Sequence, residues 1–348
     1  MLPYWILFVF FAVGAALDPR RREGEPTRIN FVMLIGALAT AFFVGMRFEV
    51  GSDWFTYEYL YKLIEHRSLE KALQFGDPGY QFVSWVFIQG DYDIWAVNLV
   101  CSSIFMWGLY RLCQNQPLPL LAMLVAVPYL IIVVAMGYTR QSAAIGFAMA
   151  GFASLERGGS LLRFSVYALL AATFHKTAIA VLPVAIFSNP RNRIMNLLGG
   201  VAIGVSMYTA LLADSVDHLV KNYIDAEYQS QGALIRVMMN VIPAIIMLRF
   251  GKLLNFERNE KRFWTIMSLA AFAALFALFL SPSSTAVDRI ALYILPLQVA
   301  VIPRAVFLFK SIKMGKIFVI AYSAFVLFVW MFFAQHSSGW LPYEFFPL

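Results

Sequence analysis

Apolar residues along the chain are grouped in long runs that short polar segments separate. A helix needs about 20 apolar residues to cross the hydrocarbon of a bilayer, and a shorter run suffices when its flanks contribute. The pattern predicts about twelve spans, near residues 2–17, 29–46, 93–112, 118–138, 141–156, 161–174, 176–188, 194–212, 234–249, 263–281, 289–309 and 316–334. We therefore expect an all-α fold, a polytopic transmembrane helical bundle that forms one integral-membrane domain over residues 1–348.

The composition supports a membrane protein and excludes several other classes. Hydrophobic residues make up 61% of the chain and charged residues 14%, whereas soluble domains carry about 25% charged residues. A soluble enzyme, a disordered chain and a disulfide scaffold are therefore excluded. The only two cysteines, Cys101 and Cys113, would lie about 18 Å apart on one predicted helix, beyond the reach of a disulfide.

The basic residues indicate how the chain is oriented. With the N-terminus outside, about two thirds of the 27 Lys and Arg residues lie on the inner side, and most of the 20 Asp and Glu residues lie on the outer side. This distribution follows the positive-inside rule. The net charge of +7 is thus explained by membrane orientation, and we expect no nucleic-acid partner.

Two connections on the predicted outer face are longer than the others, at about residues 47–93 and 214–233. Both are long enough to carry short amphipathic helices. Residues 78–89 are apolar but too short to span the bilayer. We interpret them as an interfacial or re-entrant helix, because a span at this point would invert every later loop.

Three arginines oppose the charge bias by standing at outer membrane boundaries. Arg47 closes the second predicted span, Arg140 opens the fifth and Arg289 opens the eleventh, while His175 and Lys176 form the tip of an outer hairpin. Guanidinium groups donate in pairs to phosphate oxygens and stay charged, so such a cluster suits a lipid diphosphate. The simpler alternative is that each arginine only extends to lipid headgroups.

Acidic residues and a histidine supply candidate bases. Asp53 and Tyr57 share one face of a predicted helix, as a general base beside a sugar-stacking ring would, although Asp53 also suits a helix N-cap. His175 has an ordinary pKa near 6.5, which suits proton transfer. Asp91-Tyr92-Asp93 has the form of a metal-binding pair, but a loop or helix cap explains it better, and we expect no metal and no cofactor.

The chain resembles the EpsG family within the Wzy-type bacterial polysaccharide polymerases. Five blocks, spread over about residues 30–295, carry the resemblance. They are R-x-x-x-G-S-D-W-x-x-Y at Arg47–Tyr57, D-P-G-Y at Asp77–Tyr80, Y-T-R-Q-S-A-A at Tyr138–Ala144, F-H-K-T-A at Phe174–Ala178 and D-R-I-A-L-Y at Asp288–Tyr293. The acidic residue of the Pro-Gly block, Asp77, departs from the family's pattern.

The resemblance implies an inverting glycosyltransferase without a cofactor. It would join polyprenyl-diphosphate-linked oligosaccharide repeats of an exopolysaccharide, capsule or O-antigen on the outer, periplasmic face of a bacterial cytoplasmic (inner) membrane. Its partners would be the lipid-linked oligosaccharide, membrane lipid and a chain-length regulator protein. A diphosphate is a stable leaving group, so the reaction needs cations to hold it and a base to activate the attacking hydroxyl.

The resemblance also implies roles for individual residues. Diphosphate binding would fall to Arg47, Arg140, Arg289 and Lys176, with Arg140 expected to matter most. Either His175 or Asp53 would act as the base. The glycan would contact Tyr57, Tyr80, Tyr138, Gln141 and Tyr293, although interfacial tyrosines are common in any membrane protein.

Two other functions also fit a cluster of outer arginines. A lipid-linked oligosaccharide flippase or other transporter would gather arginines around a diphosphate, but it should line a route across the whole membrane with polar groups. The span interiors are nearly free of charge, which favours a one-sided active site. An O-antigen ligase-like transferase, or an acyltransferase that modifies the glycan, is a further alternative.

Overall fold

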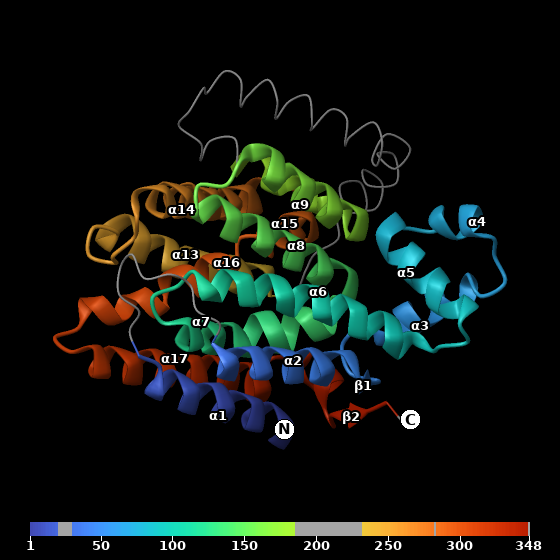
Figure 1. Cartoon of the computed structure of the whole chain (residues 1–348), viewed down its shortest axis with the longest axis horizontal. Helices are drawn as coiled ribbons and strands as arrows, with labels where there is room; N and C mark the ends of the chain where they lie inside the picture. The colour runs from blue at the N-terminus through green and yellow to red at the C-terminus, as the bar shows by residue number, and fades with distance from the viewer. Residues whose placement is uncertain (20–29, 185–231, 282, 347–348) are drawn as a thin grey trace.

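The computed structural model describes residues 1–19, 30–184, 232–281 and 283–346, and most of them are helical (Figure 1). The elements are α1 (Leu2–Leu17), α2 (Phe31–Gly45), β1 (Arg47–Phe48), α3 (Trp54–Leu63), α4 (Leu69–Leu73), α5 (Pro78–Gln89), α6 (Ile94–Gln114), α7 (Pro119–Ala126), the π-helix η1 (Val127–Ala135), α8 (Thr139–Glu156), α9 (Leu161–Phe174), η2 (Lys176–Val181), α13 (Ala233–Phe250), α14 (Arg258–Leu280), α15 (Ser284–Ala291), α16 (Pro296–Val301), η6 (Pro303–Leu308), α17 (Ile312–Phe333), η7 (Ser337–Trp340) and β2 (Glu344–Phe345).

The described helices confirm a helical membrane protein. Five of them are long and apolar enough to cross a membrane: α6, α13, α14, the run Ser284–Leu308 and α17. Four shorter apolar helices accompany them: α1, α2, the run Pro119–Ala135 and α9. The predicted span at 194–212 lies outside the described residues, as do residues 185–188 of the predicted span at 176–188 and all but the last two residues of the predicted loop at 214–233. The total of about twelve spans therefore stays a prediction.

Three features differ from the sequence prediction. The fold is not purely helical, because β1 and β2 form a two-stranded antiparallel sheet. The predicted span at 176–188 begins as the 3₁₀ helix η2. The apolar run at 289–309 is divided into α15, α16 and η6, with Pro296 and Pro303 at the first positions of the last two. Proline has no N–H to continue the preceding helix, so each one starts a new segment.

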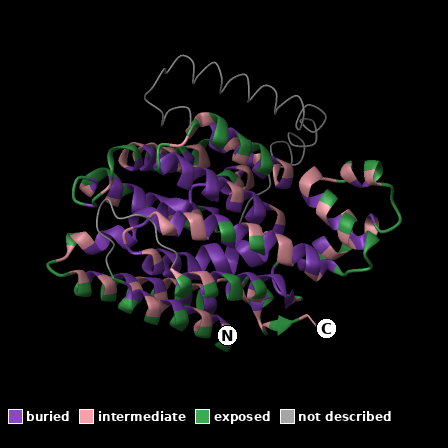
Figure 2. Ribbon diagram, in the orientation of Figure 1, coloured by how far each residue is buried: buried purple, intermediate pink, exposed green. Residues whose placement is uncertain are grey.

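Close packing in the centre of the bundle depends on glycine. The helices α6 and α8 cross where Gly108 meets Gly146, and a Cβ on Gly108 would overlap the Gly146 carbonyl oxygen. Lipid tails are as apolar as the helix surfaces, so helices in a membrane associate through close packing, and small residues let their backbones approach. Figure 2 shows buried residues along these central helices and exposed ones on the outer faces of α1 and α17. The exposed faces are apolar, with Ile6 60% and Phe325 64% exposed, as lipid contact requires.

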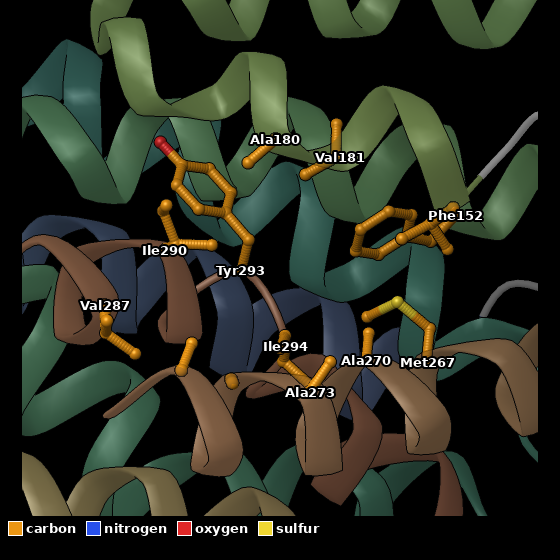
Figure 3. Close-up of a pocket in the computed structure, with 13 residues that line it drawn as sticks. Phe152, Ala180, Val181, Met267, Ala270, Ala273, Val287, Ile290, Tyr293 and Ile294 are labelled. Atoms are coloured by element: carbon orange, nitrogen blue, oxygen red, sulfur yellow. The ribbon is translucent and has the colours of Figure 1, made fainter. Parts of the chain in front are cut away.

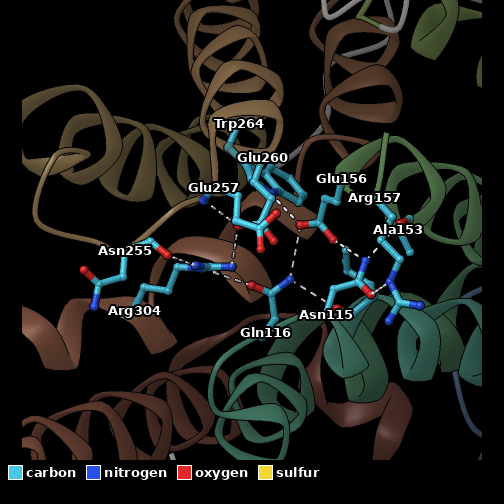
Figure 4. Close-up of polar contacts among 11 residues, drawn as sticks. Asn115, Gln116, Ala153, Glu156, Arg157, Asn255, Glu257, Glu260, Trp264 and Arg304 are labelled. Carbon is cyan, nitrogen blue, oxygen red and sulfur yellow. Dashed lines mark hydrogen bonds and ion pairs between the residues drawn. The ribbon is translucent and has the colours of Figure 1, made fainter. Parts of the chain in front are cut away.

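A buried polar network joins three helices and a turn at one end of the bundle (Figure 4). The Glu156 carboxylate accepts hydrogen bonds from the indole N–H of Trp264 at 2.7 Å and the amide of Gln116 at 3.2 Å. Arg304 donates to Gln116 Oε1 at 3.2 Å and pairs with Glu260 at 3.1 Å. One guanidinium thus serves two buried carboxylates, directly and through an amide. Unpaired buried charge is costly, so this network fixes α8, α14 and η6 to the α6–α7 turn.

The helices α3, α4 and α5 lie together at the opposite end, where the N- and C-termini also lie (Figure 1). Because this end is the one predicted to face outside, we call it the outer end. The short helix α5 covers residues 78–89, the segment that the sequence predicts as an interfacial or re-entrant helix.

The predicted sidedness can be tested with single cysteines, because both native cysteines are buried and we expect neither to react with a bulky reagent. Ser338 and Asn259 are exposed at opposite ends of the molecule. We expect Ser338→Cys to react with an impermeant maleimide in sealed cells and Asn259→Cys to react only after permeabilisation. Labelling of Asn259→Cys in sealed cells would reverse the orientation.

Candidate active site

A pocket of about 590 Å³ opens at the outer end. Residues from five stretches of the chain line it: Ser52, Asp53, Tyr129, Val133, Tyr138, Gly232, Ile235, Arg236, Arg289, Trp330, Phe333, Ala334, Gln335, His336 and Trp340. We call it the outer pocket. Its lining combines charged groups, aromatic rings and aliphatic side chains, which suits an amphiphilic ligand.

Asp53 is held at the outer pocket by the turn that precedes α3. Gly51 has a φ of 109° and its N–H donates to the Gly339 carbonyl at 2.8 Å, which fixes the turn against the C-terminal segment. Asp53 occupies the N-cap position of α3, yet its side chain does not bond to the helix. It accepts a hydrogen bond from Ser52 Oγ at 3.2 Å. In the described chain no cation pairs with this carboxylate, so it faces the pocket as an available acceptor.

Four residues are predicted to bind the diphosphate, and of these Arg289 lines the outer pocket. Its guanidinium lies 4.5 Å from the centre of the Tyr138 ring and donates to Gln141 Oε1 at 3.3 Å. Gln141 Nε2 in turn donates to the Arg289 backbone carbonyl at 2.6 Å. No described carboxylate forms an ion pair with Arg289, so its charge is held in position and remains open to an anion.

Arg236 is a functional candidate that the sequence analysis did not single out. It pairs with Asp288 through two bonds, of 2.6 and 2.7 Å, and also lines the outer pocket. The pair joins α13 to α15 and neutralises the carboxylate next to Arg289 in sequence. The available signal was its position at an outer boundary, which opposes the charge bias as Arg47, Arg140 and Arg289 do.

Arg140 lies in a second cluster beside the pocket, where it is paired. Its Nη1 donates to Asp77 Oδ2 at 2.9 Å, and Asp77 Oδ1 accepts the backbone N–H of Lys176 at 3.3 Å. The guanidinium also lies 5.6 Å from the centre of the Tyr57 ring, and Tyr57 is 5.7 Å from Tyr80. Asp77 therefore links α5, α8 and the tip of the 175–176 hairpin.

Several buried polar atoms in this second cluster have no hydrogen-bond partner in the described chain. They are Arg140 Nε, the Tyr80 hydroxyl and Gln81 Nε2. Buried donors are normally satisfied by protein or water. Water or a polar ligand beside Arg140 would satisfy them.

His175 is the C-cap residue of α9. Its Nδ1 lies 2.7 Å from Thr177 Oγ1, which is 3.4 Å from the Tyr293 hydroxyl. Burial, helped by the positive charges of Arg140, Arg289 and Lys176, lowers the pKa of His175 well below its ordinary value of 6.5. The imidazole is therefore neutral at pH 7 in the free protein and able to accept a proton.

Arg47 is used within the fold and does not line the outer pocket. It is 1% exposed and donates to the carbonyls of Val44 and Val50, at 2.6 and 3.1 Å, and to Thr139 Oγ1 at 2.7 Å. The Val44 carbonyl belongs to the last turn of α2, where helix carbonyls lack partners within the helix. Arg47 thus caps α2 and ties it to the start of α8. Its predicted part in diphosphate binding has no open surface to act through.

The predicted glycan contacts are divided in the same way. Tyr138 lines the outer pocket. In contrast, Tyr57, Tyr80, Gln141 and Tyr293 are at most 5% exposed. They support Arg140, Arg289 and Thr177 from behind, and their predicted contact with a sugar is untested.

Further aromatic lining of the outer pocket comes from the C-terminal part of the chain, where Trp330 is half-buried and Trp340 is 2% exposed. Trp330 and Trp340 line the outer pocket with ring centres 5.1 Å apart. Trp340 Nε1 donates to the Ile132 carbonyl at 2.8 Å, and the Tyr4 hydroxyl donates to the Trp340 carbonyl at 2.6 Å. Residues 334–346, which we call the C-terminal strap, therefore close one side of the pocket. Scattered tryptophans and His336 gave no sequence signal for this wall.

The Asp91-Tyr92-Asp93 segment serves a structural purpose. Asp93 is the N-cap of α6, and its carboxylate accepts the Ile94 N–H at 2.7 Å. Within the described ranges, no group of three or more His, Cys, Asp or Glu side chains is arranged to hold a metal ion. The expectation that no metal takes part remains a prediction.

Comparison with known protein families identifies the family of the chain. The model of the EpsG family matches residues 30–345, which includes all the side chains described for the outer pocket and the second cluster. No curated protein and no solved structure matches the chain.

The Arg140–Asp77 pair should stabilise the outer end. Removing one partner of a fully buried ion pair costs on the order of 3–5 kcal/mol, because the other charge is left unpaired. The Arg140 side chain is 27% exposed, so the loss here should be smaller. We expect Arg140→Gln to lower the unfolding temperature of the detergent-solubilised protein, and Asp77→Asn on that background to restore part of the loss. The exposed Arg67 provides a control, because Arg67→Gln should change little. Additive losses in the double variant would show that the two charges do not stabilise each other.

The lowered pKa of His175 predicts a pH-dependent stability. Below about pH 6.5 the unfolded chain binds a proton that the folded protein does not bind, so stability falls as the pH drops. Above that pH the imidazole is neutral in both states and adds no dependence. His175→Gln should therefore reduce the decrease in unfolding temperature between about pH 6.5 and pH 5, whereas His66→Gln should not. Parallel curves for wild type and His175→Gln would contradict a neutral, half-buried His175.

Proposed function

The chain belongs to the EpsG family of polysaccharide-polymerase-like membrane proteins, and on this premise we propose that it is a membrane glycosyltransferase. It polymerises polyprenyl-diphosphate-linked oligosaccharide repeats on the outer face of the cytoplasmic membrane, with inversion at the anomeric carbon and without a cofactor. One observation carries the proposal: Asp53 and Arg289 line the same pocket, and neither has a partner of opposite charge in the described chain.

These two residues match the two needs of the reaction. The acceptor hydroxyl attacks the anomeric carbon, its proton passes to the Asp53 carboxylate, and the bond from that carbon to the diphosphate oxygen breaks with its electron pair. The departing diphosphate gains negative charge, which Arg289 stabilises through charge-assisted hydrogen bonds. Attack opposite the leaving group gives the inverted sugar. His175 is the alternative base, supported by its neutral imidazole.

The remaining basic residues have supporting roles. Arg140 and Lys176 contribute positive charge near Arg289. The charges of all three residues lower the pKa of the same side chain, His175. Arg236 neutralises Asp288 through its two bonds and so leaves Arg289 free for the diphosphate. Arg47 positions the start of α8 through Thr139.

The glycan would contact the aromatic wall of the outer pocket. Tyr138 and Trp330 provide rings, the buried Trp340 supports Trp330 from behind, and Gln335 and His336 provide polar groups. Sugar rings pack against aromatic faces while their hydroxyls bond to polar side chains, so this wall suits the acceptor oligosaccharide. A chain-length regulator and membrane lipid complete the proposed partners.

A transporter remains the main competing function. Its substrate would also be an anionic lipid-linked glycan, but its polar groups should continue through the membrane. In the described chain the charged clusters lie at the two ends, and the segment of α6 between them buries Cys101, Phe105, Met106 and Leu109. This apolar centre supports a one-sided enzyme.

The proposal is tested by incubating purified protein with polyprenyl-diphosphate repeat units and no nucleotide sugar, and by separating the products by length. A ladder of longer glycans is expected. Arg289→Ala should lower turnover by about a hundredfold or more, well beyond its effect on substrate binding, because the interaction strengthens as the diphosphate gains charge. Arg289→Lys should restore only part of the rate, since an ammonium lacks the paired donors.

Arg67→Ala is the control for this series, because Arg67 is exposed and its guanidinium lies over Phe75. If Arg289→Ala keeps the rate of the control, Arg289 does not hold the leaving group. If the wild type moves the lipid-linked repeats across a vesicle membrane without elongating them, the protein is a transporter.

A further inference from the structure

A second cavity, of about 280 Å³, is lined in part by Val287 and Ile290 of α15 (Figure 3). Its described lining is almost entirely apolar, with Met267 and Ala274 from α14, Phe152 from α8, and Ile290 from α15. Tyr293, just beyond α15, contributes its ring. We call it the apolar cavity.

The helix α15 separates the two spaces and presents a different chemistry to each. Arg289 lines the outer pocket, while Val287 and Ile290 line the apolar cavity. Ile290 is 42% exposed, so the cavity reaches the surface of the described chain along this helix. Neighbouring residues of one short helix thus contact a charged space and a hydrocarbon-like space.

Tyr293 connects the apolar cavity to the side chains next to the second cluster. Its ring lines the cavity and is 2% exposed, while its hydroxyl lies 3.4 Å from Thr177 Oγ1. Thr177 is bonded to His175 at 2.7 Å, and the charges of Arg140 and Arg289 both act on that imidazole. The apolar cavity therefore ends next to the basic groups.

We propose that the apolar cavity binds the first isoprene units of the lipid-diphosphate donor, an inference that rests on the proposed function. The donor joins a branched hydrocarbon directly to a diphosphate. The protein likewise places an apolar cavity, which suits the hydrocarbon, next to basic side chains, which suit the diphosphate. An engineered cavity of about 150 Å³ holds one benzene. A cavity of about 280 Å³ therefore accepts only the beginning of a polyprenyl chain, and the remainder lies in the bilayer.

The arrangement assigns different entrances to the two substrates. The lipid-linked donor enters from the side of α14 and α15, and the acceptor glycan enters from the aromatic wall of the outer pocket. Arg289 lies between them, and Gln141 holds both its guanidinium and its carbonyl. The apolar lining also excludes a sugar from the cavity, because sugar hydroxyls would lose their hydrogen bonds there.

The test fills the cavity with a larger side chain and measures kcat/KM for a donor with a long polyprenyl tail. Ala274, which is 9% exposed, lies in the cavity, whereas Leu269 on the same helix is 56% exposed and does not line it. Ala274→Phe should lower kcat/KM for a long-chain donor by about tenfold or more, because the tail loses buried apolar area. Leu269→Phe is the matched control and should behave as wild type. Ala270→Leu, a smaller change at another lining residue, serves if Ala274→Phe does not insert.

A binding measurement separates this inference from the proposed function. Sugar-free polyprenyl diphosphate with a photoreactive group on an early isoprene unit is irradiated with wild-type protein in nanodiscs. Crosslinks at Met267 or Ile290, lost in Ala274→Phe, are expected whether or not polymerisation occurs. Crosslinks confined to other helices, or displaced equally by a diacyl phospholipid, would overturn the assignment. A wild type that crosslinks at these residues but makes no ladder would instead contradict the proposed function.

Discussion

The outer end of this protein is organised by the cost of burying charge. A charge removed from water is stable only when it is paired or hydrogen-bonded, and most of the buried ones here meet that condition. Asp77 is paired with Arg140, Asp288 with Arg236, and Arg47 with two carbonyls and a hydroxyl. These pairings join helices that are distant in sequence and leave Asp53 and Arg289 facing the outer pocket. The arrangement of the helices and the chemistry of the pocket therefore have one cause.

The cost of burying charge also explains how much of the structure could be predicted from the sequence. The apolar runs indicated most described helices, and the charge bias indicated the outer arginines, because both depend on local composition. The sequence could not show which arginine is bound within the fold and which is open. That distinction depends on partners such as Thr139 for Arg47 and Gln141 for Arg289, which are 92 and 148 residues away. Arg236 was missed for the same reason, because its role depends on its ion pair with Asp288, which is distant in sequence.

The short helix α15 shows how little chain is needed to separate two environments. It has 8 residues, and side chains at successive positions of a helix point about 100° apart. Asp288 and Arg289 can therefore meet polar partners while Val287 and Ile290 meet hydrocarbon. The division of the apolar run by Pro296 makes this possible, because α15 ends before the deeply buried α16 begins.

The C-terminal strap has a consequence for how the protein is made. It contributes Gln335, His336 and Trp340 to the pocket and reaches back to Gly51 near α3 and to Tyr4 in α1. A ribosome releases the chain from its N-terminus onward, so Asp53 is present long before the strap that completes its surroundings. Throughout insertion into the membrane, the nascent chain holds the early helices and the paired charges but lacks one wall of the pocket. The outer pocket therefore gains this wall only after residues 334–340 have been synthesised, later than α1, the turn before α3 and the paired charges.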